Sequence, residues 1–125
     1  MKKGILIDVV NETITEVEVG DYKDIQKKIG CQLFDVVSVD DDNDVYVDDE
    51  GLLSIDEDSK FFGFKGSNVK LGGNGLVLGI DHETGDSKNT TLTVEYLKER
   101  IKFFTFLTIT SYLQTKNYLI QIGMY

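Results

Sequence analysis

The feature of this chain that most restricts its fold is a series of short β-type runs joined by tight polar turns. Residues 4–10 and 14–19 are rich in Ile and Val, and the three residues between them suit a hairpin loop. Residues 34–39 and 45–47 make a second pair around a turn at 40–44. Apolar and polar residues alternate in the first pair, which is typical of strands with one buried face and one wet face. Hairpins should therefore dominate the sheet, with antiparallel pairing.

Further strands are predicted at residues 61–65, 69–71, 76–80 and 102–110, and glycines punctuate the first three. Two short helices interrupt the strands. Asp21 can cap the first helix, which should end at Gly30, and Thr93 can cap the second. A polar loop is expected at 81–89. The predicted fold is α+β, with a mostly antiparallel sheet of five to seven strands and two helices packed on one face.

A chain of 125 residues is long enough for one domain, which we place at 1–110. Residues 111–125 form a C-terminal extension whose pattern fits a helix, an edge strand or an oligomer contact equally. The segment 103–125 contains no long apolar run, so no membrane span is expected, but it could join copies of the chain. The single Cys31 and the absence of a signal-peptide pattern predict a cytoplasmic protein.

The charge of the chain is concentrated in its centre. Thirteen basic and 22 acidic residues give a formal net charge of −9. Eleven of the acids lie between Asp35 and Asp58, where there is no Lys or Arg, so this segment carries −11 and the remaining residues carry +2. Such a surface repels phosphate backbones, so we expect no direct binding to nucleic acid. It should instead attract a host protein with a basic surface, and the predicted contacts are Asp40, Asp42, Asp44, Asp48, Asp49 and Glu50.

The same acids resemble a calcium loop in part. Alternate carboxylates at Asp40, Asp42 and Asp44 match its opening, but the required glycine is replaced by Val45 and the closing glutamate by Gly51. We therefore predict a solvated turn and no metal site. One histidine, His82, and one cysteine cannot build a structural zinc site, and no nucleophile–base pair is evident. We expect no catalytic residues and no cofactor, and a protein that is not an enzyme.

A second hypothesis is a small-ligand site that binds or sequesters a nucleotide signal. A glycine-rich turn can offer backbone amides to a phosphate, and nearby aromatic rings can stack on a base. The residues predicted for this site are Phe62, Phe64, Gly72, Gly73, Asn74 and Gly75.

Several segments together resemble a known family. They are residues 4–8, 17–22, 29–37, 46–53 and 73–79, of which Asp48-Asp49-Glu50-Gly51-Leu52-Leu53 and the glycine-framed Leu76-Val77-Leu78 are the most specific. The chain is similar, over residues 1–104, to a family of small phage and mobile-element proteins catalogued as a domain of unknown function. The resemblance implies a phage or mobile-element accessory protein and supplies no catalytic residues.

The acidic segment and the resemblance lead to one main hypothesis. The chain should act by binding, and it should inhibit a host defence or regulatory protein through its acidic surface. The alternatives are the small-ligand site and a structural, oligomeric accessory protein that uses residues 103–125.

Overall fold

The structure is a computed structural model that describes residues 1–50 and 57–105. The predicted extension at 111–125, most of the proposed oligomer contact at 103–125, and the part of the predicted last strand beyond Thr105 lie outside the described residues. No helix among residues 1–50 and 57–105 is long and apolar enough to cross a membrane.

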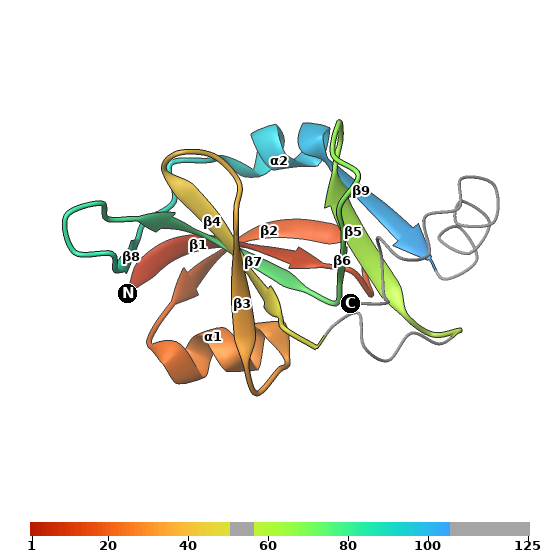
Figure 1. Cartoon of the computed structure of the whole chain (residues 1–125), viewed down its shortest axis with the longest axis horizontal. Coiled ribbons are helices and arrows are strands. Elements are labelled where there is room, and N and C mark those ends of the chain that lie inside the picture. The colour runs from red at the N-terminus through yellow and green to blue at the C-terminus, as the bar shows by residue number, and fades with distance from the viewer. Residues whose placement is uncertain (51–56, 106–125) are drawn as a thin grey trace.

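Sheet A is the larger of two antiparallel sheets. Its strand order is β2-β1-β7-β4-β3, and the short β8 pairs with β7 beside this path. The six strands are β1 (Lys2–Asp8), β2 (Thr13–Val19), β3 (Phe34–Ser38), β4 (Asn43–Asp48), β7 (Gly75–Ile80) and β8 (Ser87–Lys88). The two predicted hairpins, β1–β2 and β3–β4, flank β7, so β7 is central although it comes late in the chain (Figure 1).

Sheet B has three strands in the order β6-β5-β9, namely β5 (Lys60–Phe64), β6 (Lys70–Gly72) and β9 (Ile101–Thr105). Its strands lie to the right of sheet A in Figure 1. Opposite residues such as Phe62, Leu71 and Phe103 share one face of this sheet. Phe62 and Leu71 belong to the main core, with Phe103 packed against it, so this face of sheet B packs on sheet A.

Local capping signals set the ends of both helices. In α1 (Tyr22–Ile29) the Asp21 side chain accepts a hydrogen bond from the Asp24 N–H, and Gly30 ends the helix with a φ of 80°. In α2 (Val94–Arg100) the Thr93 hydroxyl oxygen accepts from the Tyr96 N–H at 3.1 Å. These are the caps that the sequence predicts.

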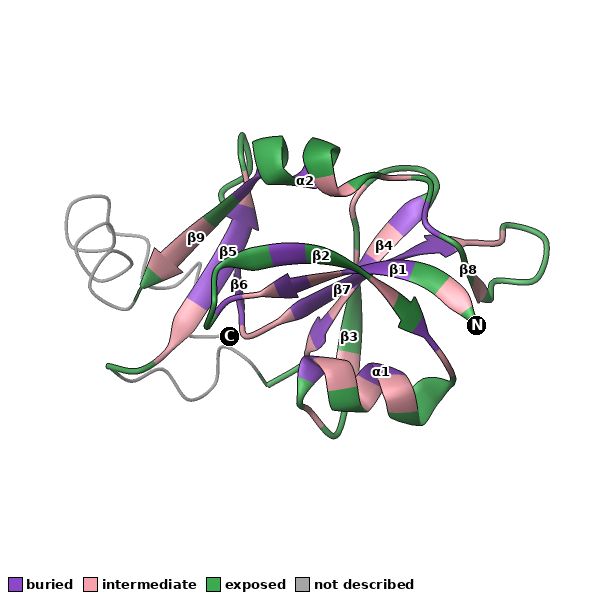
Figure 2. Cartoon of the chain, turned by 180° about the vertical axis from the view of Figure 1, so that it is seen from behind, coloured by how far each residue is buried: buried purple, intermediate pink, exposed green. Residues whose placement is uncertain are grey.

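The fold class is α+β with antiparallel strands, as predicted, but the helices lie on opposite faces of sheet A. Leu76 and Leu78 of β7 pack with α1, whereas Val77 faces α2 and sheet B. Every residue of β7 but the last is buried, as the purple strand in Figure 2 shows. A strand that is apolar on both faces needs a covering layer on each side. The expectation that both helices cover one face is therefore wrong.

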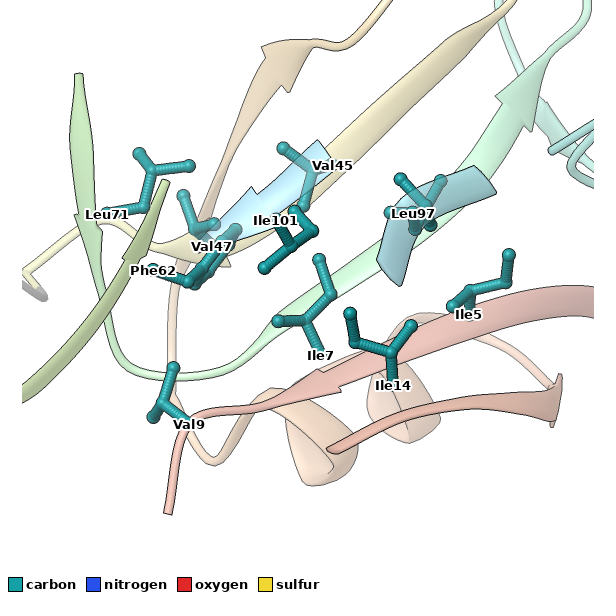
Figure 3. Packing of buried hydrophobic residues seen from close by; sticks show 11 residues of the cluster. Ile5, Ile7, Val9, Ile14, Val45, Val47, Phe62, Leu71, Leu97 and Ile101 are labelled. Carbon is teal, nitrogen blue, oxygen red and sulfur yellow. The ribbon is translucent and has the colours of Figure 1, made fainter. Parts of the chain in front are cut away.

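The main hydrophobic core fills the space between sheet A, sheet B and α2. Figure 3 shows Ile5 and Ile7 of β1 below Leu97 of α2, with Phe62 of sheet B beside Val47 of β4. Leu97 and Phe62 are fully buried. A second, smaller core lies under α1 and contains Ile25 and Ile29. The protein thus has three layers, with α1 on one side of sheet A and sheet B with α2 on the other.

Sheet A has six strands, within the predicted five to seven, whereas the separate three-stranded sheet B was not predicted. Two predicted boundaries need correction. The predicted loop at 81–89 contains the two-residue strand β8. It forms because Ser87 and Lys88 pair with Ile80 and Gly79 at the end of β7. The sequence predicts Asn43 and Asp44 in the turn at 40–44, because both are polar. In the structure they belong to β4 and pair with Gly79 and Leu78.

Candidate partner-binding surface

The six predicted acidic contacts all lie on the β3–β4 hairpin, here called the acidic hairpin, whose β3 is an edge strand of sheet A (Figure 1). They form two groups. Asp40 and Asp42 are in the turn, with Asp44 just inside β4; Asp48, Asp49 and Glu50 are at the other end of that strand. A strand of this length separates the groups by about 17 Å. Among the described residues, none of the six carboxylates forms an ion pair with Lys or Arg.

The turn group is held by hydrogen bonds within the turn. Asp40 Oδ1 accepts from the Asp42 N–H at 2.8 Å and from Asn43 Nδ2 at 3.0 Å. These are the bonds of an aspartate that caps its own turn, which is the solvated turn predicted for this sequence. In the described part of the chain, no three His, Cys, Asp or Glu side chains are placed to share a metal ion.

A second acidic loop lies beside this turn and was missed by sequence reasoning. The Ile80 N–H donates to the Asp42 carbonyl at 2.9 Å, and His82 Nε2 lies 3.3 Å from Asp42 Oδ1. The β7–β8 loop thereby adds the exposed or half-exposed carboxylates of Asp81, Glu83 and Asp86 to the turn group. Two cations border this region: Lys2, whose Nζ donates to Ser87 Oγ at 2.8 Å, and the exposed Lys88, which follows Ser87 in β8. The loop is acidic in the sequence, but its position beside residues 40–42 depends on the pairing of β4 with β7.

The strand-end group is tied to the start of β3 and to the residue before it. The Asp49 N–H donates to the Leu33 carbonyl at 3.3 Å, and Asp48 is opposite Phe34 in the register of the hairpin. Asp48 Oδ1 accepts from the Glu50 N–H at 2.9 Å. The two exposed carboxylates that follow β4 are thus held near residues 33 and 34.

Two nearby groups respond to the negative potential of the hairpin. Burial raises the pKa of the Cys31 thiol, and the charges of Asp48 and Asp49 raise this pKa further. Burial also raises the pKa of Tyr46, with a smaller contribution from Asp44, while a hydrogen bond with Ser87 opposes the rise. A thiol with a raised pKa is largely protonated at neutral pH, so Cys31 is a poor nucleophile.

An apolar patch adjoins the strand-end group. It consists of Tyr22, Leu33 and Val36, whose exposed fractions are 53%, 58% and 43%. The half-buried Phe34 lies behind it, with its ring centroid 4.9 Å from that of Tyr22 and 5.2 Å from that of Tyr46. Exposed aromatic and aliphatic side chains with charged neighbours are the usual composition of a protein–protein contact.

The residues predicted for a small-ligand site do not form one open surface. Phe62 is fully buried, and a methyl group built on Gly75 would be 2.6 Å from its ring. The Asn74 side-chain oxygen accepts from the Val9 N–H at 3.0 Å, which ties the glycine turn to the end of β1. Gly72 is buried and Gly73, with a φ of 78°, makes the turn. Phe64, in contrast, is half-exposed and lines a separate cavity.

The fold and this surface define a small α+β protein with an exposed acidic hairpin beside an apolar patch. A family model described as a domain of unknown function (DUF3846) matches residues 1–102, and the chain belongs to this family. The match confirms the resemblance to a domain of unknown function and carries no information about a phage source. Neither the curated proteins nor the solved structures gave a match to this chain.

Proposed function

We propose that the protein acts by binding a host protein with a basic surface. In this proposal it is an accessory protein of a phage or mobile element that inhibits a defence or regulatory protein in the host cytoplasm. The observation that carries the proposal is the set of exposed carboxylates on the acidic hairpin that have no Lys or Arg partner among the described residues. The source in a phage or mobile element rests on the sequence resemblance alone.

The strand-end group is the better supported centre of this contact. Asp48, Asp49 and Glu50 adjoin the apolar patch, and a charged rim around an apolar centre suits a protein partner better than a metal ion or a nucleic acid. The rim would steer a basic partner and the patch would supply the buried area. The turn group would extend the negative surface along the same hairpin.

A competition assay with charge-neutral variants tests this proposal. The test variant carries Asp48→Asn, Asp49→Asn and Glu50→Gln, which remove three charges and keep the Asp48 side-chain oxygen that caps the turn. The matched control carries Glu16→Gln, Glu18→Gln and Glu99→Gln, three exposed acids on β2 and α2. Both variants change the net charge equally, so a difference between them reports position and not total charge.

The readout is displacement of a short labelled DNA duplex from a panel of purified bacterial DNA-binding regulators and restriction enzymes. We expect the unmodified protein to displace the duplex from at least one panel member, more weakly as salt rises. The strand-end variant should compete at least about tenfold less well, equivalent to about 1.4 kcal/mol, and the control should match the unmodified protein. Failure to displace the duplex from any member, or equal competition by both variants, would show the proposal to be wrong.

A further inference from the structure

A cavity of about 360 Å³ lies on the other side of β3, between that strand, the β5–β6 turn and the end of α2. Its lining includes the apolar side chains of Val39, Phe64 and Leu71, together with Lys65, Tyr96 and Arg100. Its volume is within the range of small-molecule sites. The acidic hairpin contributes β3 to one wall, but the six acidic contacts are not among the described lining residues.

The charge of this cavity is opposite to that of the chain. The Asp, Glu, His, Lys and Arg residues among its described lining residues are Lys65 and Arg100, both basic, in a protein whose net charge is −9. The Lys65 N–H donates to the Arg100 carbonyl at 2.7 Å, which holds the two residues together where β5 and β9 pair. Neither cation forms an ion pair with a carboxylate in the described part of the chain. The pair is therefore available to an anion.

The cavity also presents an aromatic surface. Arg100 Cζ lies 4.8 Å from the centre of the Tyr96 ring, and Tyr96 is 40% exposed. A guanidinium that is stacked on a ring is oriented and still has its N–H donors free for an oxyanion. Phe64, half-exposed on the apolar wall, offers a second ring.

An added β-strand is a less suitable occupant of this region. The edge of β3 could pair with an extended peptide, but the outward Val36 N–H already donates to Asp35 Oδ1 at 2.8 Å. An acidic side chain on an edge strand also opposes pairing with another strand. The cavity is thus better suited to a compact ligand than to a peptide.

We propose that this cavity binds a small anion that carries a planar ring, of the class of the nucleoside monophosphates. The anionic group would lie at Lys65 and Arg100, and the ring would lie against Tyr96 and Phe64. Charge-assisted hydrogen bonds from a guanidinium to a phosphate are the strongest contacts of this kind, so Arg100 should contribute most. This binding does not depend on the six acidic contacts, because none of them is among the described lining residues of the cavity.

The test is isothermal titration calorimetry of the full chain with adenosine, guanosine, cytidine and uridine monophosphates. The corresponding nucleosides lack the anion, and ribose phosphate lacks the ring. At least one monophosphate should bind, and each of its two fragments should bind at least about tenfold more weakly, because each lacks one set of contacts worth about 1.4 kcal/mol or more. Amide shifts in NMR spectra should be confined to the neighbourhood of residues 64–67 and 96–100.

Arg100→Gln should weaken the binding at least about tenfold. The matched control is Lys98→Gln, which removes one positive charge from the same helix at an exposed position outside this cavity. The control should bind as the unmodified protein does. The proposal is overturned if no monophosphate binds, if ribose phosphate binds equally well, or if Arg100→Gln has no larger effect than Lys98→Gln. An acidic peptide that binds here when nucleotides do not would also overturn the ligand class.

Discussion

Replacing Asn43 with alanine should destabilise the protein strongly, because this side chain joins the acidic turn to the segment that leads into α2. Asn43 is fully buried. Its Nδ2 donates to Asp40 Oδ1 at 3.0 Å and to Thr91 Oγ1 at 2.8 Å. Its Oδ1 accepts from the Thr90 hydroxyl at 2.6 Å and from the Thr91 N–H at 3.1 Å. One amide thus satisfies groups from two segments that are nearly 50 residues apart in the sequence.

The size of the effect follows from the groups that are left without partners. Thr90 is 3% exposed, so its hydroxyl donor would lose its partner in a place that water does not reach, which costs about 1–3 kcal/mol. Thr91 is exposed, so water can replace the partner that its N–H loses, and this loss should cost about 1 kcal/mol at most. The Asp40 carboxylate is exposed and can hydrate. Asn43→Ala should therefore lower the free energy of unfolding by about 2–4 kcal/mol, a large part of the stability of a typical domain.

Urea denaturation followed by circular dichroism measures this loss. The control is Asn68→Ala, an exposed asparagine in the β5–β6 turn, which should change the free energy of unfolding by less than about 0.5 kcal/mol. Combining Asn43→Ala with Thr90→Val should cost about 1–2 kcal/mol less than the sum of the two single changes, because both remove the same hydrogen bond. A loss below about 1 kcal/mol for Asn43→Ala, or strict additivity, would refute this reasoning.

Two further predictions concern the core and the thiol. Gly75→Ala should lower the free energy of unfolding, measured in urea, by about 1–3 kcal/mol, because its methyl group would be 2.6 Å from the buried Phe62 ring. The loss caused by Gly75→Ala should be smaller in a chain that also carries Phe62→Leu. An equal loss in that chain would contradict the steric explanation. The pKa of Cys31 is raised by burial and then by Asp48 and Asp49, so the thiolate fraction at a given pH is below that of an ordinary thiol. Replacing both with asparagine (Asp48→Asn with Asp49→Asn) should lower this pKa and speed the alkylation of Cys31 by iodoacetamide at a fixed pH in the alkaline range. If the pH dependence of the alkylation rate is unchanged, the two charges do not act on the thiol.

The sequence by itself determined the local elements of this protein. Asp21 and Gly30 mark the two ends of α1, and Thr93 marks the start of α2, because each acts on backbone groups within a few residues. The two hairpins follow from alternation with period two and from short polar turns. The α+β class follows from the order of these elements, and the segment of high negative charge is visible in the composition of residues 35–58.

Tertiary structure alone decided how these elements combine. The central place of β7, the separation of sheet B and the opposite positions of the helices depend on contacts between residues far apart in the chain. The apolar run Leu76 to Leu78 indicates burial, but it does not say which element covers each face. In the same way, the neighbours of the acidic turn in the β7–β8 loop and the cavity at Arg100 exist only where distant strands pair. Capping and turn signals act on residues close by in the sequence. The positions of these sites instead depend on how distant elements pack together, and many residues along the chain contribute to that packing.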